Sequence, residues 1–347
     1  MRGIAVGICV LLLAGLSLLP APAQARDPCP ALRAQESAGE VATRIAAIAC
    51  AEWQRWQQPF ITPDGRLASA SVWEGEARGM ADGGAPWRRV AQYWIDTGLA
   101  EREGGAACRM ALADPRDPGL ACRAFVIDVP WSAAFVSWVL QRAGVPGFRP
   151  AAAHFDYVRA ALRDPDGSPY RFRDPRSTPP APGDLLCYVR TRQLRGMDGL
   201  AALIARGERG LAMHCDIVVS TATPGDARAW LVGGNLLQAV TLRLLPLNAA
   251  GRFWGLPQRG GDDPACSPDA LAFCDFNRQD WAVLLQLRPQ DELARLGPVA
   301  PPADATVPAD VAPEAATPCC VECVLGSGIR RCRADETPTP TEPPAQD

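Results

Sequence analysis

The segment at residues 131–144 constrains the fold of this chain most strongly, because it is apolar on every side. The sequence predicts a helix that begins near Trp131 and ends at Gly144. Its apolar positions are Ala133, Ala134, Phe135, Val136, Trp138, Val139 and Leu140. A helix without a polar face has no side to turn toward water, so it must lie at the centre of a domain.

Composition allows a large core around such a helix and excludes one class of partner. The chain has 347 residues, of which 48% are hydrophobic. All 35 basic residues are arginines. The chain also has 38 acidic residues, so its formal net charge is -3. Since there is no arginine-rich run, the chain lacks the basic footprint that a phosphate backbone requires, and we expect no nucleic-acid partner.

The first 25 residues are typical of a secretory signal peptide. Arg2 precedes an apolar run at residues 4–19, and Ala23-Gln24-Ala25 forms a small-residue cleavage pattern. We therefore expect a periplasmic or secreted protein that begins at Arg26 and has no membrane span after cleavage. The alternative is a retained anchor, for which the run is short of the roughly 20 residues that a spanning helix needs.

Cysteine usage agrees with export. Of 13 cysteines, removal of Cys9 with the signal leaves 12, an even number that favours disulfides in an oxidising compartment. The predicted pairs are Cys29 with Cys50, Cys108 with Cys122, and Cys266 with Cys274. A cluster of Cys319, Cys320, Cys323 and Cys332 could bind zinc in a reducing cell. We expect no metal and no cofactor in the exported protein.

The periodicity predicts helices first and strands afterwards. Helices are expected at residues 31–56, 86–97 and 131–144, with a loop at 101–123. Strands are expected at 184–189, 214–220, 229–232 and 240–245, with a helical insertion at 191–210. This order indicates an α+β fold in which N-terminal helices pack on a small antiparallel sheet. Residues 26–296 are expected to form one domain, followed by a Pro-rich, Cys-containing tail at 297–347.

A serine stands at the start of the predicted central helix. Ser132 would sit where free backbone N–H groups and the positive end of the helix dipole lower the cost of an alkoxide or an oxyanion. A nucleophile is chemically sensible there, although an N-terminal serine also serves as an ordinary helix cap. Any chemistry that needs an imidazole must use His154 or His214, because the chain has no other histidine.

Several motifs around this serine resemble those of a known superfamily. The stretch Trp131-Ser132-Ala133-Ala134-Phe135-Val136 is similar to the nucleophile helix of the NlpC and CHAP peptidases and amidases, with Ser in place of their Cys. The resemblance spans about residues 86–247 and includes Pro182-Gly183-Asp184-Leu185, the strand that His214 opens, and Gly233-Gly234-Asn235. The sequences at residues 153–157 and 214–218 also resemble a bacterial family known only as a domain of unknown function.

The superfamily resemblance implies a papain-like fold and a set of roles. Ser132 would attack, His214 would act as the base, and Asn235 would orient the imidazole. The strand pattern offers Asp216 as an alternative for that last role, because it lies two residues along the same strand and so shares the face of His214. Trp131 and His154 would border the substrate. The alternatives without a catalytic role are a buried core histidine for His214 and a packing or capping role at the start of a helix for His154.

No cysteine offers an obvious substitute nucleophile. Cys187 lies inside a predicted strand, and Cys215 should point to the face opposite His214, so that these two could form a cross-strand disulfide. We therefore expect an exported hydrolase that cleaves peptide or amide bonds of the cell wall. The alternatives are a non-catalytic module that binds the wall or a partner, and an esterase or acyltransferase.

Overall fold

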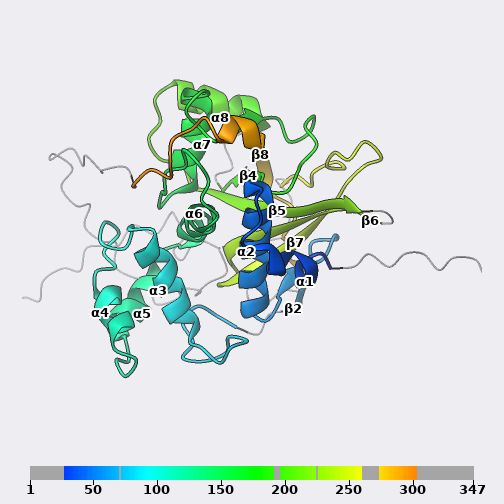
Figure 1. The fold of residues 1–347 in the computed structure, drawn as a ribbon. Coiled ribbons are helices and arrows are strands. Elements are labelled where there is room, and N and C mark those ends of the chain that lie inside the picture. Colours follow the sequence, from blue (N-terminus) through cyan, green and yellow to red (C-terminus); the bar gives the residue numbers. More distant parts are fainter. Residues whose placement is uncertain (1–26, 70–71, 191–195, 224–225, 260–272, 303–347) are drawn as a thin grey trace, which may run out of the picture.

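An eight-stranded sheet forms the centre of the molecule (Figure 1). The computed structural model describes residues 27–69, 72–190, 196–223, 226–259 and 273–302. In chain order the strands are β1 Phe60–Ile61, β2 Leu67–Ser69, β3 Tyr170–Arg173, β4 Leu185–Val189, β5 Met213–Thr223, β6 Asp226–Leu236, β7 Ala239–Pro246 and β8 Asp280–Leu287. Their order in the sheet is β2-β1-β7-β6-β5-β4-β8-β3. Neighbouring strands are antiparallel except β1 and β7, which run parallel.

The α+β class is confirmed, but the sheet is larger than predicted and is mixed. Strands β1 and β2 come before most helices in the chain and extend one edge of the sheet. They have two and three residues, which is too short for a period-2 pattern to register. Strand β8 was missed because five consecutive residues, from Trp281 to Leu285, are buried, so its sequence does not alternate.

The helices are α1 Cys29–Leu32, the short 3-10 helix η1 Arg33–Gln35, α2 Val41–Arg55, α3 Pro86–Asp96, α4 Ala107–Ala113, α5 Leu120–Asp128, α6 Ser132–Arg142, α7 His154–Arg163, α8 Gly196–Ala205 and α9 Gln290–Leu293. The predicted helices at 86–97 and 131–144 are confirmed as α3 and α6. The one predicted at 31–56 is interrupted at residues 36–40. The predicted loop at 101–123 is wrong, because α4 and the start of α5 occupy it and a disulfide joins them.

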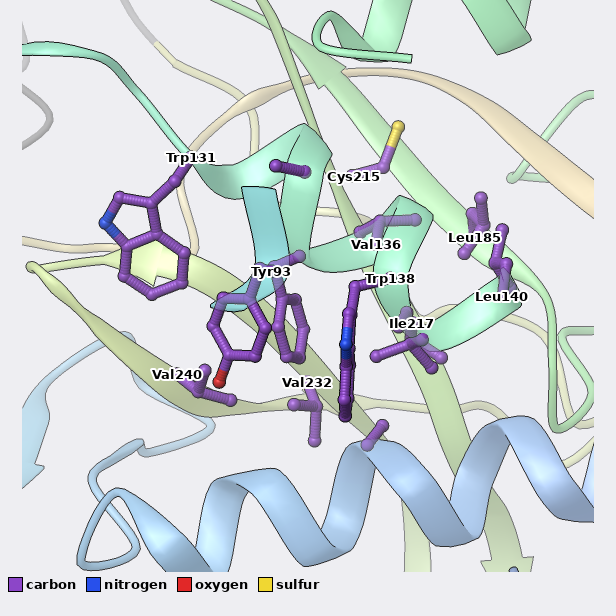
Figure 2. Close-up of a cluster of buried hydrophobic side chains, with 14 of the residues drawn as sticks. Tyr93, Trp131, Val136, Trp138, Leu140, Leu185, Cys215, Ile217, Val232 and Val240 are labelled. Carbon is purple, nitrogen blue, oxygen red and sulfur yellow. The ribbon is translucent and has the colours of Figure 1, made fainter. Parts of the chain in front are cut away.

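Helix α6 packs on β5 and β6 and is also covered by α2 and α3, which explains why it needs no polar face. Figure 2 shows Val136 and Leu140 of α6 in one buried cluster with Ile217 of β5, Val232 of β6 and Tyr93 of α3. All five side chains are completely buried. Burying one such aliphatic side chain contributes about 1.5–3 kcal/mol, so this contact fixes α6 on the sheet.

The other face of the central strands is also covered. A second buried cluster there contains Leu186, Tyr188, Val218, Ala229, Leu231, Leu245, Leu247, Phe253, Leu256, Trp281 and Leu284. Side chains alternate along β4 and β5, so Cys187 and Cys215 face α6 whereas Tyr188 and His214 face this second cluster. Polar groups on either face of these strands are therefore out of contact with bulk water.

Three disulfides join neighbouring elements. The predicted pairs Cys29–Cys50 and Cys108–Cys122 are confirmed, and Cys187–Cys215 bridges β4 and β5. Cys274 is also disulfide-bonded. Its predicted partner Cys266, the signal peptide and the cysteine cluster of the tail lie outside the described residues.

Contacts with the domain continue beyond residue 296. The backbone N–H of Gly147 donates to the carbonyl of Gly297 (2.7 Å), and the N–H of Ala300 donates to the carbonyl of Phe148 (2.9 Å). Within the described ranges no single helix is long and apolar enough to cross a membrane. Helices α5 and α6 reach that length and composition only as a pair, and they are bent by 99° to each other.

Candidate functional site

Side chains from two distant segments fix the start of α6. With its amide oriented to satisfy both partners, Asn235 accepts from the N–H of Trp131 (3.2 Å) and donates to the carboxylate of Glu74 (3.2 Å). The indole N–H of Trp131 donates to the same carboxylate (2.6 Å). Ser132 follows directly as the first residue of the helix. Its hydroxyl therefore lies beside first-turn N–H groups that have no partner within the helix.

The hydroxyl of Ser132 is hydrogen-bonded to His154, with 2.8 Å between Oγ and Nε2. His154 begins α7. Ser137 of α6 holds the preceding loop, because its Oγ donates to the carbonyl of Ala151 (2.9 Å) and accepts from the N–H of the same residue (3.0 Å). The Nδ1 atom of His154 contacts the hydroxyl of Tyr157, one helical turn further on.

His214 has a separate set of partners. Its Nε2 is 2.8 Å from Oδ1 of Asp216, and Oδ2 of Asp216 accepts from Nε of Arg243 (2.8 Å). Its Nδ1 is 3.4 Å from a guanidinium nitrogen of Arg190. An arginine can only donate, so Nδ1 carries the lone pair and the hydrogen is on Nε2, pointing at Asp216.

The expected contact between Ser132 and His214 is therefore replaced by one with His154. Both nitrogens of His214 are directed at other groups, and its ring centroid lies 5.1 Å from that of His154. The physical reason is the register of β5. It places His214 opposite Tyr188, on the face away from most of α6. The sequence identified the two imidazoles but not their division of partners.

Asp216, and not Asn235, is the residue that contacts His214. Asp216 lies two residues along the same strand and so shares its face, as predicted. Asn235 lies near the end of β6, where the pairing with β7 is irregular between Gly233 and Leu236. Its φ of 52° is a left-handed conformation that asparagine tolerates, and its side chain holds the start of α6 instead.

The two glycines before Asn235 are required by close approach. A Cβ on Gly233 would lie 2.0 Å from Oδ1 of Asp216, and a Cβ on Gly234 would lie 2.5 Å from the Cβ of Phe135. The Gly-Gly-Asn segment of β6 thus lies against the acidic partner of one histidine and against the helix that carries Ser132.

Burial sets the charge state of the site. Burial, with the nearby charges of His214 and Arg190, lowers the pKa of His154 well below its usual 6.5. Burial also lowers the pKa of His214, although Asp216 opposes the shift. For Asp216, burial alone would raise the pKa, but Arg243 and His214 outweigh it and the pKa is below the usual value. At neutral pH the site therefore holds two neutral imidazoles and an ionised Asp216 paired with Arg243.

The site is almost closed. Ser132 is 6% exposed and His154 4%, and His214 is fully buried. Trp131, expected beside the substrate, is also fully buried and stacks on Trp56, with ring centroids 5.5 Å apart.

The sequence pattern did not point to four residues of the site. They are Glu74, Tyr157 as a partner of His154, Arg190 and Arg243. Arg243 had a signal, since a charged residue inside the apolar run Thr241-Leu242-Arg243-Leu244-Leu245 must find a buried partner. Glu74 had none, because its segment has no periodic pattern.

The described residues offer neither a thiol nucleophile nor a metal site at this place. Cys187 and Cys215 are bonded to each other on the face opposite His214, as the strand alternation predicted. No group of three or more His, Cys, Asp or Glu residues within the described part of the chain is placed to hold a metal ion.

Comparison with known proteins identifies a family without assigning a chemistry. Neither the curated proteins nor the solved structures include a significant match to this chain. Residues 81–287 match the family described as "Uncharacterized protein conserved in bacteria (DUF2272)". The match covers more than half of the chain, including Ser132, both histidines, Asp216 and Asn235. The chain therefore belongs to this bacterial family of uncharacterised proteins.

Proposed function

We propose that this protein is an exported serine hydrolase with a papain-like, NlpC/CHAP-type core that cleaves peptide or amide bonds of the bacterial cell wall. The order of its parts supports the likeness: the helix with Ser132, then β4 after Pro182-Gly183-Asp184, then β5 with His214, then the end of β6 with Asn235. The disulfides agree with an oxidising compartment, and that compartment suggests the wall as substrate.

One observation carries the proposal: Ser132 at the start of α6 is hydrogen-bonded to an imidazole 2.8 Å away. A serine hydroxyl is a weak nucleophile until a base takes its proton during attack. His154 is within the range for such a transfer. The first-turn N–H groups of α6 are suited to receive a developing oxyanion.

The reaction would follow from these positions. Ser132 Oγ attacks the carbonyl carbon and passes its proton to Nε2 of His154, while the carbonyl oxygen becomes an oxyanion beside the helix start. His154 then gives that proton to the leaving amine as the C–N bond breaks, leaving an acyl group on Ser132. A water molecule, deprotonated by His154, hydrolyses this ester and regenerates the hydroxyl.

His214 and Asp216 would support His154 from behind. Asp216 is paired with Arg243 and bound to Nε2 of His214, so the two residues fix the His214 ring beside the ring of His154. Asn235 and Glu74 would act by holding the start of α6.

The closure of the site favours a second candidate, a non-catalytic module that binds the wall or a partner. Ser132 and His154 are nearly buried and satisfy each other, as polar groups of a structural core do. An esterase or acyltransferase with the same serine is a variant of the first proposal, since a serine nucleophile also suits esters.

Release of peptides or amines from purified cell wall separates these functions. We expect release by the wild-type protein, loss of about 10³-fold or more in Ser132→Ala, and retained activity in Ser132→Cys, which restores the usual nucleophile of the resembling superfamily. Ser168→Ala, which removes another buried serine hydroxyl, is the control. Silence of wild type and Ser132→Cys on wall, peptide and ester substrates supports the binding module instead.

A further inference from the structure

The hydroxyl of Tyr157 and Nδ1 of His154 form a buried contact behind the Ser132 pair. Tyr157 is 5% exposed. Burial and the nearby Tyr170, Asp156 and Asp216 raise the pKa of Tyr157 well above 10, so the phenol keeps its hydrogen. Three polar groups therefore lie in a row: the phenol, the imidazole and the alcohol of Ser132.

The number of hydrogens in this row allows two arrangements. A neutral imidazole has one N–H and one lone pair. Either the phenol donates to Nδ1 and Nε2–H donates to Ser132, or Ser132 donates to Nε2 and Nδ1–H donates to the phenol oxygen.

Acid strength selects between them. A phenol, with a reference pKa near 10, is a much stronger acid than a serine alcohol and hence a better donor to the imidazole lone pair. In addition, among the hydrogen bonds of the described residues, His154 is the one partner of the Tyr157 hydroxyl. His154 is likewise the one partner of the Ser132 hydroxyl among these hydrogen bonds, so each arrangement leaves one hydroxyl hydrogen without an acceptor: that of Tyr157 in the second and that of Ser132 in the first. Because the phenol is the stronger donor, leaving its hydrogen unpaired costs more, and the first arrangement is favoured.

We propose that Tyr157 sets the tautomer of His154 and holds the resting site in the form in which Nε2–H donates to Ser132. Tyr157 is a positioning residue in this account, since it acts through His154. The assignment itself does not depend on a hydrolase.

Its consequence for catalysis rests on the proposed function. In the resting form Nε2 has no lone pair to accept the Ser132 proton. The imidazole must lose one proton at Nε2 and gain one at Nδ1 by exchange with water, and the phenol must turn so that Nδ1–H donates to its oxygen. Net charge and proton number are unchanged. The resting site is thus held inactive until this exchange occurs.

Nitrogen-15 NMR of the full chain tests the tautomer directly, because the protein contains only two histidines. Both are expected to be neutral Nε2–H tautomers at pH 7, His154 through Tyr157 and His214 through Arg190 and Asp216. His154→Gln assigns the spectrum by removing one set of signals. A hydrogen on Nδ1 of His154 in the wild-type protein overturns the proposal, whatever the variants do.

Tyr157→Phe gives the second readout. It should move the Nδ1 resonance of His154 toward that of an imine nitrogen without a hydrogen bond and leave His214 nearly unchanged. Tyr170→Phe is the matched control, because it removes a buried phenol that donates to the carbonyl of Gly183. An unmoved Nδ1 resonance in Tyr157→Phe overturns the proposal. None of these spectra needs a substrate, so an inactive protein would count against the hydrolase and not against the tautomer.

Discussion

The two histidines show how much a single residue's surroundings decide. Both are buried and adjacent, yet His154 contacts a serine and a tyrosine while His214 contacts a carboxylate and an arginine. Only His154 is within hydrogen-bond distance of a potential nucleophile. The site therefore divides into a pair that can react and a charged pair, Asp216 with Arg243, that stays fixed.

The charge state of His154 leads to a pH prediction. A general base works in its neutral form, and burial keeps the pKa of His154 well below 6.5. As pH falls, activity should therefore persist through pH 6.5 and be lost only well below it. The measurement is kcat/KM as a function of pH, with a peptide fragment of the cell wall as the substrate. An acid limb centred at or above pH 6.5 would contradict this assignment of the base.

Gly233 provides a test of the buried contact between β6 and Asp216. A Cβ at this position would lie 2.0 Å from Oδ1 of Asp216 and 3.0 Å from Nε2 of His214. We expect Gly233→Ala to lower the free energy of unfolding by about 3 kcal/mol, because the Asp216 side chain must move and disturb its bond with Arg243. Chemical denaturation measures the loss. Gly210→Ala is the control, since a Cβ there meets nothing within 4 Å, and an equal effect in both variants would contradict the contact.

At the scale of the elements, Asp184, the residue directly before β4, has a strongly raised pKa. Oδ2 of Asp184 accepts from the N–H of Ala181 (2.9 Å), and Oδ1 accepts from the N–H of Leu287 at the end of β8 (2.8 Å). Burial raises its pKa to about 7, although the two N–H bonds oppose the shift. Asp184 links β4 to its neighbour β8, and the free energy needed to keep its carboxyl buried depends on pH because the ionised form is the costlier one.

The sign of that dependence follows from the direction of the shift. The folded-state pKa is above the usual 3.8, so the folded protein binds the proton more tightly than the unfolded chain. Stability from this group is fully present below pH 3.8 and declines as pH rises to about 7, by at most about 4 kcal/mol. Comparing the free energy of unfolding of wild type and Asp184→Asn from pH 4 to 8 should show a smaller decline in the variant.

An exposed carboxylate is the control for this comparison. Asp164 also accepts a backbone N–H, from Gly167 (2.9 Å), and Asp164→Asn is the matched variant that removes such a carboxylate from the surface. If Asp184→Asn declines as steeply as the wild type, Asp184 is not the group that titrates.

The elements that the sequence could predict are those with a strong local pattern. Helix α3 has clear periodicity, α6 is a long apolar run, and each is followed by a glycine within two residues. Strands β4 to β7 are apolar runs between turn residues. The pattern fails where distant parts of the chain decide the structure. Two-residue β1 exists through its pairing with β2 and with the distant strand β7, and α4 is held by a disulfide to α5.

The sequence could single out the central residues of the candidate site, but it could not predict most of the contacts between them. Residue type and position singled out Ser132, both histidines and Asp216. The pairing of Ser132 with His154 depends on how α6, the loop at Ala151 and α7 pack together, through Ser137. A sequence pattern does not contain that packing.

At the scale of the whole molecule, the C-terminal boundary of the domain can be tested by truncation. A chain ending at Pro302 should keep the wild-type Tm, because it retains the hydrogen bonds of Gly297 and Ala300 with residues 147–148. A chain ending at Leu296 loses both and should melt several degrees lower. Thermal unfolding of the two truncated chains and the full chain measures this. Equal Tm values for the two truncations would place the boundary at residue 296, as the sequence predicted.

The central claim is that Ser132 and His154 are the reacting pair, and site-mapped labelling with a serine-directed fluorophosphonate tests it most directly. Mass spectrometry of the labelled wild-type protein should find the adduct on Ser132. His154→Gln should slow labelling by about 10²-fold or more, as loss of a general base does, and His214→Gln should slow it less. Circular dichroism checks that each variant is folded. An adduct on another residue, no adduct at all, or equal labelling of a folded His154→Gln variant would contradict the claim.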